Sequence, residues 1–164
     1  MAEIYISLGS NINRQHYIEQ GLQALTDVFG SLTLSSLFES EPVGFAGKAF
    51  YNMVAGVSTE LTLAEVAATL REIEFAHGRN QDAKKFSPRT LDLDLLLYDD
   101  IIADSPAQIP RDEISKNAFV LCPLAEVAGH LAHPIIGQCY DELWQQYDKS
   151  QQKLKTVAFI WPKK

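Results

Sequence analysis

Segments with strand-like and helix-like periodicity alternate along the first hundred residues, and their order restricts the possible folds. Residues 4–8 are short, apolar and β-prone, and the cluster Gly9-Ser10-Asn11 after them is typical of a turn. Residues 14–29 carry apolar side chains at helical spacing, and Gly30 follows them. We therefore expect a strand, a turn and a helix in this part of the chain.

The next part predicts two strands joined by a polar turn, then a helix, a polar loop and a further strand. The two strands are residues 32–38 and 50–59, and the turn between them is residues 39–47. The helix is residues 62–77, the loop residues 79–88 and the further strand residues 90–98. The helix has a capping box at its start, because the Thr62 hydroxyl and the Glu65 carboxylate can each accept from a free amide of the first turn. The order β-α-β-β-α-β predicts an α+β fold with a ferredoxin-like core, in which helices pack on a mainly antiparallel sheet.

The C-terminal part predicts additional helices. Residues 116–128 have helical character despite Pro123, residues 141–147 predict a short helix, and residues 157–161 predict a last strand. A chain of 164 residues suits one domain with a sizeable core, so we expect residues 1–164 to form a single domain.

The charge balance and the apolar runs exclude several classes of partner. The formal net charge is −7, so the chain repels polyanions unless it gathers its basic residues, and nucleic acid is not expected as a partner. No apolar run approaches the roughly 18 residues of a membrane span, and residues 1–6 lack the features of a signal peptide. Cys122 and Cys139 have no metal-ligand spacing and are expected to be reduced thiols. We expect a cytoplasmic monomer that acts on small molecules.

The stretch Leu91-Asp92-Leu93-Asp94-Leu95 is the clearest chemical signal in the sequence. Alternation of period two puts both aspartates on one face of a strand, with Cα atoms roughly 6.6 Å apart. Both carboxylates could then reach one pair of divalent cations, which prefer oxygen ligands and can neutralise a polyphosphate during phosphoryl transfer. The alternative is the solvated face of an edge strand, and the pattern alone leaves both possibilities open.

Basic residues gather just before this strand. They are Arg79, Lys84, Lys85 and Arg89. Arginine forks match phosphate oxygens, so the cations and the two carboxylates together favour a magnesium-polyphosphate site over simple surface charge balance. The sequence contains neither glycine-rich nucleotide motif, G-x-x-x-x-G-K-[ST] or G-x-G-x-x-G, so ATP would be held by side chains and metal ions.

Aromatic and amide side chains could bind a flat heterocycle. A ring can lie between the faces of Phe50 and Phe119, and Asn52 can offer both a donor and an acceptor to its edge. Two phenylalanines of the core are the alternative. His130 and His133 have a spacing that could chelate a metal, although we expect them to flank a turn instead.

Together these motifs resemble the 6-hydroxymethyl-7,8-dihydropterin pyrophosphokinase family. The resemblance rests on Ile6-Ser7-Leu8-Gly9-Ser10-Asn11, Phe50-Tyr51-Asn52, Gly78-Arg79 and above all Pro88-Arg89-Thr90-Leu91-Asp92-Leu93-Asp94-Leu95. The motifs occur in the family's order over nearly the whole chain, and the last is specific to the family. The resemblance implies transfer of pyrophosphate from ATP to the hydroxymethyl group of a pterin in folate synthesis, with release of AMP.

The resemblance also implies a role for each matching residue. Asp92 and Asp94 would bind two Mg²⁺ ions that bridge the triphosphate and the pterin hydroxyl, and Arg79 and Arg89 would hold phosphate oxygens during transfer. Arg71 and Glu74 lie where the family's helix approaches ATP. Lys84, Lys85 and Arg111 are the candidates to bind ATP in place of basic residues that the family usually has. Those implied for pterin binding are Ser40, Val43, Phe50, Asn52 and Phe119.

Three departures from the family pattern concern the expected phosphate contacts. Gln81 stands where the family usually has a second arginine, Arg111 where it has a histidine, and Asn117 where it has an arginine. Each lost charge-assisted contact would cost on the order of 1.5–3 kcal/mol. An active pyrophosphokinase is the leading hypothesis. The alternatives are a divergent paralogue that binds pterin or nucleotide with weak or no turnover, and a pyrophosphokinase for a related heterocycle.

Overall fold

The computed structural model describes residues 1–40, 49–77, 90–150 and 152–161. The elements in chain order are β1 (Ala2–Ser10), α1 (Arg14–Phe29), β2 (Thr33–Leu34), β3 (Leu37–Ser40), β4 (Phe50–Thr59), α2 (Leu63–Ala76), β5 (Asp92–Tyr98), the 3-10 helix η1 (Asp112–Ser115), α3 (Ala118–Ala128), α4 (Tyr140–Gln146) and β6 (Leu154–Val157). None of the helices in these ranges is long and apolar enough to cross a membrane.

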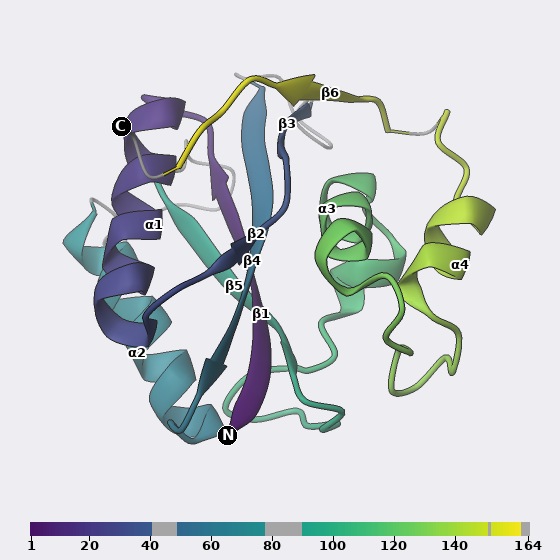
Figure 1. Ribbon diagram of the computed structural model, residues 1–164, viewed down its shortest axis with the longest axis horizontal. Coiled ribbons are helices and arrows are strands. Elements are labelled where there is room, and N and C mark those ends of the chain that lie inside the picture. Colours follow the sequence, from purple (N-terminus) through teal and green to yellow (C-terminus); the bar gives the residue numbers. More distant parts are fainter. Residues whose placement is uncertain (41–48, 78–89, 151, 162–164) are drawn as a thin grey trace.

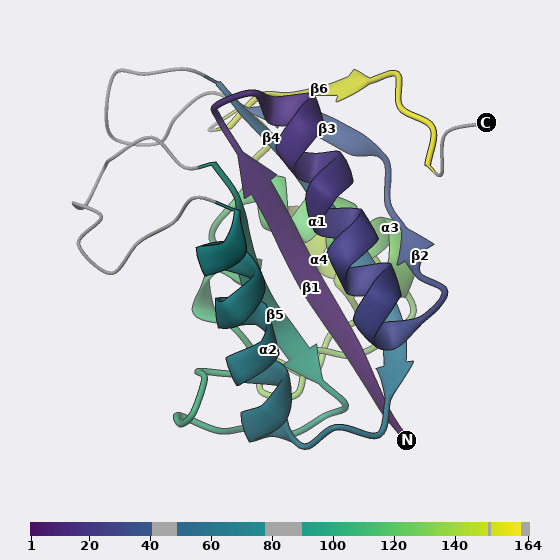
Figure 2. The same ribbon diagram turned by 90° about the vertical axis from the view of Figure 1, so that its left-hand side faces the viewer.

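The sheet has the strand order β5-β1-β4-β3-β6, and β2 pairs with β4 beside this path. All of its pairings are antiparallel. Helices α1 and α2 lie side by side on one face, while α3 covers the other face and α4 packs outside α3 (Figures 1 and 2). This arrangement confirms the α+β fold with a ferredoxin-like core and additional C-terminal helices.

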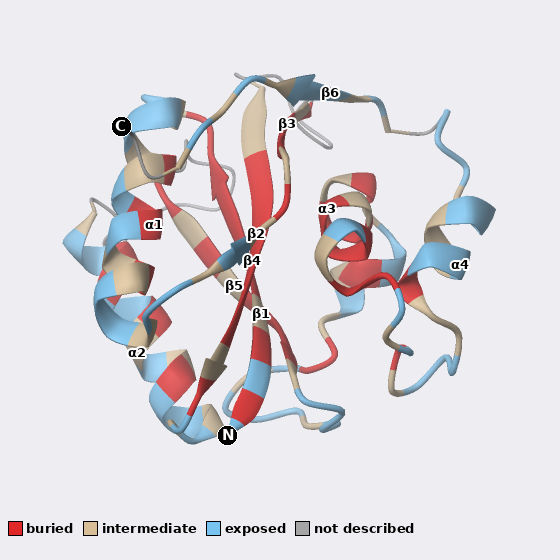
Figure 3. Ribbon diagram, viewed as in Figure 1, coloured by how far each residue is buried: buried red, intermediate tan, exposed pale blue. Residues whose placement is uncertain are grey.

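Each face of the sheet has its own apolar core (Figure 3). On the side of α1 and α2 the alternating residues Ile4, Ile6 and Leu8 of β1 are fully buried with apolar residues of both helices. On the side of α3 a second cluster joins Val54 of β4 to the apolar face of that helix. Fully burying one such side chain contributes about 1.5–3 kcal/mol, so the two clusters fix the sheet between its helical layers.

Several predicted boundaries were wrong, and backbone pairing explains the differences. Gly9 and Ser10 are not a turn, because they continue β1 and pair with Asn52 and Tyr51 of β4. The predicted strand over 32–38 is two strands, since between them the Ser35 hydroxyl accepts a hydrogen bond from the Val54 backbone N–H at 2.9 Å.

The C-terminal boundaries also differ. The last strand covers Leu154–Val157, where it pairs with β3, and the predicted strand over 157–161 was wrong except at its first residue. Phe159 and Trp161 instead pack against the core outside any strand. Helix α3 starts at Ala118, two residues later than predicted, because Lys116 is the C-cap of η1 and Asn117 is the N-cap of α3. The helix continues through the buried Pro123.

His133 lies at a turn, as the sequence predicts. Its Nδ1 accepts hydrogen bonds from the backbone N–H groups of Ile135 (3.2 Å) and Ile136 (3.1 Å). An imidazole that accepts at Nδ1 cannot be protonated there, and burial lowers the pKa of His133 below its ordinary 6.5. The neutral ring therefore stabilises this turn.

This turn predicts a pH dependence of stability. Because the folded-state pKa of His133 is lowered, its contribution is complete above about pH 6.5 and is lost as the pH falls toward the folded-state value. His133→Asn keeps an acceptor near the Nδ1 position but does not titrate. In urea unfolding from pH 7 to pH 5, the wild type should lose more stability than this variant. The exposed control His130→Asn should follow the wild type, and parallel curves for all three proteins would contradict the prediction.

Candidate active site

The register of the sheet brings the two aspartates to the face covered by α3. Asp92 pairs with Gly9, and Asp94 pairs with Ser7. On its other side Ser7 pairs with Val54, which belongs to the cluster beneath α3. Directly paired residues point to the same face, so both carboxylates lie on the α3 side. The alternating leucines of the same stretch are buried against α1 and α2.

Asp94 lies among other carboxylates. The pKa of Asp94 is raised to about 7, chiefly by burial. The Arg111 guanidinium lowers this pKa, and the charges of Asp92, Glu113 and Glu74 raise it. The Asp94 side chain still keeps 36% of its solvent accessibility, so a ligand can reach it. A divalent cation would supply the positive charge that this group of carboxylates favours.

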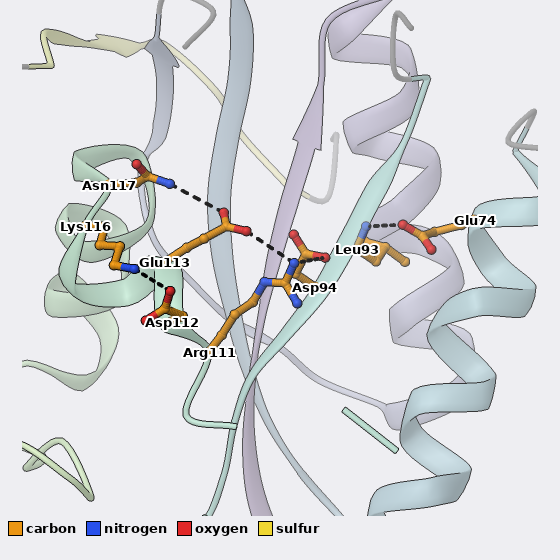
Figure 4. A network of polar contacts seen from close by, with 8 residues as sticks. All are labelled: Glu74, Leu93, Asp94, Arg111, Asp112, Glu113, Lys116 and Asn117. Carbon is orange, nitrogen blue, oxygen red and sulfur yellow. Dashed lines mark hydrogen bonds and ion pairs between the residues drawn. The ribbon is translucent and has the colours of Figure 1, made fainter. Parts of the chain in front are cut away.

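Arg111 reaches this carboxylate from the segment before η1 (Figure 4). Its backbone N–H donates to the Leu96 carbonyl at 3.0 Å, which fixes the residue beside β5. One guanidinium nitrogen, Nη2, lies 3.4 Å from Asp94 Oδ1 and 3.2 Å from Glu113 Oε1. Its Nε is buried without a hydrogen-bond partner among the described residues. Arg111 is thus held between two carboxylates and keeps donor capacity beside the aspartate pair.

Glu74 acts on the strand that carries the aspartates. It is buried on α2, and its Oε2 accepts a hydrogen bond from the Leu93 backbone N–H at 2.9 Å (Figure 4). Leu93 lies between Asp92 and Asp94 on β5, an edge strand of the sheet. The contact therefore fixes the backbone between the two carboxylates, a role that the sequence did not reveal. Arg71, one turn earlier on α2, is exposed.

A buried amide lies on the same face, two strands away from the aspartates. Asn52 Oδ1 accepts a hydrogen bond from the Ser40 hydroxyl at 2.7 Å, and both residues are 5% exposed. Because its oxygen is bound to Ser40, the Asn52 amide presents its Nδ2 group toward β1. Phe50, two residues earlier on β4, points to the same face.

Gly9 separates the amide from the carboxylates. It pairs with Asn52 on one side and with Asp92 on the other. A Cβ atom at this position would lie 3.2 Å from Asn52 Nδ2 and 3.8 Å from the Phe50 ring. The missing side chain therefore leaves room on the sheet between the amide and the metal strand. Sequence reasoning placed Gly9 in a turn, although a glycine inside a strand often marks such a close approach.

Phe119 approaches this face from the helical layer. It is the second residue of α3 and packs, partly buried, against the α3-side cluster. The structure thus brings most of the predicted residues it describes to one sheet face and the helix above it. The predicted residues Val43, Arg79, Lys84, Lys85 and Arg89 lie outside the described residues, as does Gln81.

Among the described residues, Asp92 and Asp94 are the carboxylates that the sequence predicts as metal ligands. Within the described ranges no group of three or more His, Cys, Asp or Glu side chains could hold an ion. Mg²⁺ commonly binds through one or two carboxylates and completes its octahedron with water and phosphate oxygens. Asp92 and Asp94 therefore fit magnesium that arrives with a polyphosphate better than a closed structural site.

Comparison with known proteins shows the family of this chain. The family model of 7,8-dihydro-6-hydroxymethylpterin-pyrophosphokinase (HPPK) matches residues 5–129. The 2-amino-4-hydroxy-6-hydroxymethyldihydropteridine pyrophosphokinase of Aquifex aeolicus is 32% identical over 138 residues, which cover 82% of this chain and 86% of that protein. The enzyme of the same name from Haemophilus influenzae is 35% identical over 152 residues, covering 90% and 94%.

The chain belongs to the HPPK family. A solved structure of a Plasmodium falciparum HPPK-DHPS triple mutant superposes with a TM-score of 0.75 over 92% of this chain, and its 13% identity makes it a comparison of folds alone. This chain spans 44% of that longer chain. HPPK membership agrees with the resemblance implied by the metal-strand motif.

Two departures of this HPPK sequence from the family pattern lie in the described part. Arg111 contacts Asp94 through its guanidinium, as described above. Asn117 precedes α3, and its Nδ2 donates to Glu113 Oε2 at 3.5 Å. Glu113 therefore contacts both residues that depart from the family pattern, because it accepts from Asn117 and pairs with Arg111.

Proposed function

We propose that this chain transfers pyrophosphate from ATP to the hydroxymethyl group of 6-hydroxymethyl-7,8-dihydropterin and releases AMP. As an HPPK-family member it is an ATP-dependent pyrophosphokinase of folate biosynthesis. One observation on this structure carries the assignment. The aspartate pair and the buried Asn52 amide lie on one sheet face, with the open position at Gly9 between them. No described feature favours a binding module that lacks turnover.

The nucleotide side of the site is proposed around the aspartate pair. Asp92 and Asp94 would hold two Mg²⁺ ions, which supply charge neutralisation and hold the triphosphate for in-line attack. Glu74 keeps the backbone between the carboxylates in place through Leu93. Arg111 would donate to phosphate oxygens once its pairing with Asp94 is replaced by the metal.

The pterin side is proposed around Asn52. Its Nδ2 group can donate to an acceptor on the pterin edge, because Ser40 already occupies the amide oxygen. Phe50 from the sheet and Phe119 from α3 would stack on the two faces of the ring. A pterin over Gly9 would place its hydroxymethyl group toward the aspartate pair.

Other expectations from the sequence stay predictions. We propose that residues 1–164 act as one domain and as a monomer, and the cytoplasmic location is likewise untested. The remaining proposed ATP and pterin contacts are Arg71, Arg79, Lys84, Lys85, Arg89 and Val43.

The test is a turnover assay with purified protein, ATP, Mg²⁺ and 6-hydroxymethyl-7,8-dihydropterin. We expect one AMP for each pterin diphosphate, no product without Mg²⁺, and no product from pterins that lack the hydroxymethyl group, because these have no acceptor hydroxyl. Pterin binding by calorimetry without AMP release would contradict the proposal and support a non-catalytic paralogue. Faster turnover of a different hydroxymethyl heterocycle would identify another substrate.

Arg111 provides a separate prediction. Arg111→Met keeps much of the apolar stem but removes the donors, so we expect the KM for ATP to rise about tenfold to a hundredfold, the equivalent of one charge-assisted contact. The pterin Kd should change little. Lys116→Met is the control, because it removes an exposed charge that pairs with Asp112. An unchanged KM for ATP in the Arg111 variant would remove this residue from the phosphate site.

A further inference from the structure

A glutamine from the C-terminal segment holds the start of α3. Gln152 lies between α4 and β6, 34 positions beyond the helix start in sequence. Its Oε1 accepts a hydrogen bond from the backbone N–H of Ala118, the first residue of α3, at 2.7 Å. The N-cap residue Asn117 makes no side-chain capping bond, and the first turn carries no acidic residue. Gln152 therefore supplies an acceptor to one of the N–H groups of the first turn that have no partner within the helix.

The same glutamine also sets the orientation of the Asn117 amide. Its Nε2 donates to Asn117 Oδ1 at 3.0 Å, which leaves the Asn117 Nδ2 group to donate to Glu113. If that amide turned over, its oxygen would face the Glu113 carboxylate, and two acceptors would meet. The donor on Gln152 thus favours the orientation in which Asn117 binds Glu113.

From Glu113 the polar contacts continue to the metal strand. Glu113 Oε1 lies 3.2 Å from Arg111 Nη2, and the same nitrogen lies 3.4 Å from Asp94 (Figure 4). In this view the side chains of Asn117, Glu113 and Asp94 follow one another in a row. Four contacts therefore connect Gln152 with Asp94.

The C-terminal segment is itself held on the sheet. Two residues after Gln152, Leu154 pairs with Ser40 at the end of β3. Ser40 is the residue whose hydroxyl binds the Asn52 amide. In Figure 1 the segment crosses from α4 to β6 along one end of the sheet. Gln152 is therefore fixed relative to both the sheet and α3, which a positioning residue requires.

We propose that Gln152 is a positioning residue for both halves of the active site. Its carbonyl oxygen holds the first turn of α3 and, with it, Phe119. Its amide nitrogen acts through Asn117 and Glu113 to keep Arg111 beside the aspartate pair, where it can reach phosphate oxygens. The inference rests on the proposed function, because it assigns Phe119 to the pterin and Arg111 to ATP.

Two substitutions at Gln152 separate these effects. Gln152→Glu keeps an acceptor for the Ala118 N–H but cannot donate to Asn117, so only the contacts toward Arg111 are disturbed. We expect the KM for ATP to rise about threefold to tenfold, the worth of one hydrogen bond, with an unchanged Kd for the pterin. Gln152→Ala removes both contacts, so the KM for ATP and the Kd for the pterin should both rise.

Matched controls come from Gln145, an exposed residue of α4. Gln145→Glu and Gln145→Ala make the same chemical changes and should leave both constants unchanged. The inference is overturned if Gln152→Glu has the wild-type KM for ATP, or if Gln152→Ala leaves the pterin Kd unaltered. If Gln152 had a purely structural role, both variants would lower the free energy of unfolding, and Gln152→Glu would not raise the KM for ATP while leaving the pterin Kd unchanged.

A double-mutant cycle keeps this test independent of turnover. The free energies of unfolding of Gln152→Ala, Asn117→Ala and the double variant should be non-additive, because the two side chains are hydrogen-bonded. Additive values would overturn the inference whatever the enzyme assay shows. The two measurements can also disagree. If the unfolding free energies are non-additive but the wild-type protein releases no AMP, the result contradicts the proposed function and leaves the contact between Gln152 and Asn117 supported.

Discussion

Asp94→Asn is expected to lower turnover by at least about a thousandfold while leaving the protein folded. Asparagine has nearly the shape of aspartate but lacks the charge that binds magnesium. Charge stabilisation by a catalytic metal is worth several kcal/mol, and each 1.36 kcal/mol corresponds to a factor of ten in rate. Asp94→Ala should be at least as inactive. The measurements are initial rates of AMP formation and calorimetric titration with Mg²⁺ and ATP.

The stability of this variant should distinguish loss of the metal from loss of the fold. The folded-state pKa of Asp94 is raised from 3.8 to about 7, so the folded protein favours the neutral carboxyl. The stability contributed by that neutral form is present at low pH and is lost as the pH rises through about 7. At pH 8 Asp94→Asn should therefore be no less stable than the wild type.

The control for Asp94 is the exposed Asp104, whose replacement by asparagine should leave turnover unchanged. Near-normal activity of Asp94→Asn would remove the metal assignment. A large fall in its Tm at pH 8 would show that the carboxylate acts mainly in folding.

Gly9→Val should abolish measurable pterin binding at concentrations that saturate the wild type. The first added carbon already lies 3.2 Å from Asn52 Nδ2, and the valine methyl groups would fill the space between Asn52 and Asp92. A pterin that needs the same space would clash with the added methyl groups and lose its contacts with Asn52, while the crowding of Asn52 itself costs about 1–3 kcal/mol. The measurement is a fluorescence titration with the pterin.

Gly9→Ala provides the graded comparison. Its single methyl group requires Asn52 to move by a few tenths of an ångström, so pterin affinity should fall by a smaller factor than in the valine variant. Valine favours strands, and β1 is paired on both sides, so both variants should still unfold cooperatively. Wild-type pterin affinity in Gly9→Val would show that the ring does not lie over this part of the sheet.

The local chemistry of the chain allowed much of the fold to be predicted. The Thr62 and Glu65 capping box is present at the start of α2, and Arg14–Phe29 is helical over the predicted residues. Errors occurred where pairing with a distant strand decided the outcome. Gly9 and Ser10 have turn propensity, but ladder partners on β4 extend the strand through them. Likewise, β6 forms where β3 offers an edge, rather than at the more apolar residues that follow.

The sequence by itself determined the family, the alternation that separates Asp92 and Asp94 from their leucines, and the presence of an amide and aromatic rings. These properties depend on residue type and on spacing within single segments. Only the tertiary structure decided that Gly9 opens the space between Asn52 and Asp92, that Glu74 binds the backbone of the metal strand, and that Gln152 caps α3. Such contacts join residues from 19 (Glu74 and Leu93) to 83 positions apart (Gly9 and Asp92). Their distances depend on strand register and helix packing, which no local pattern specifies.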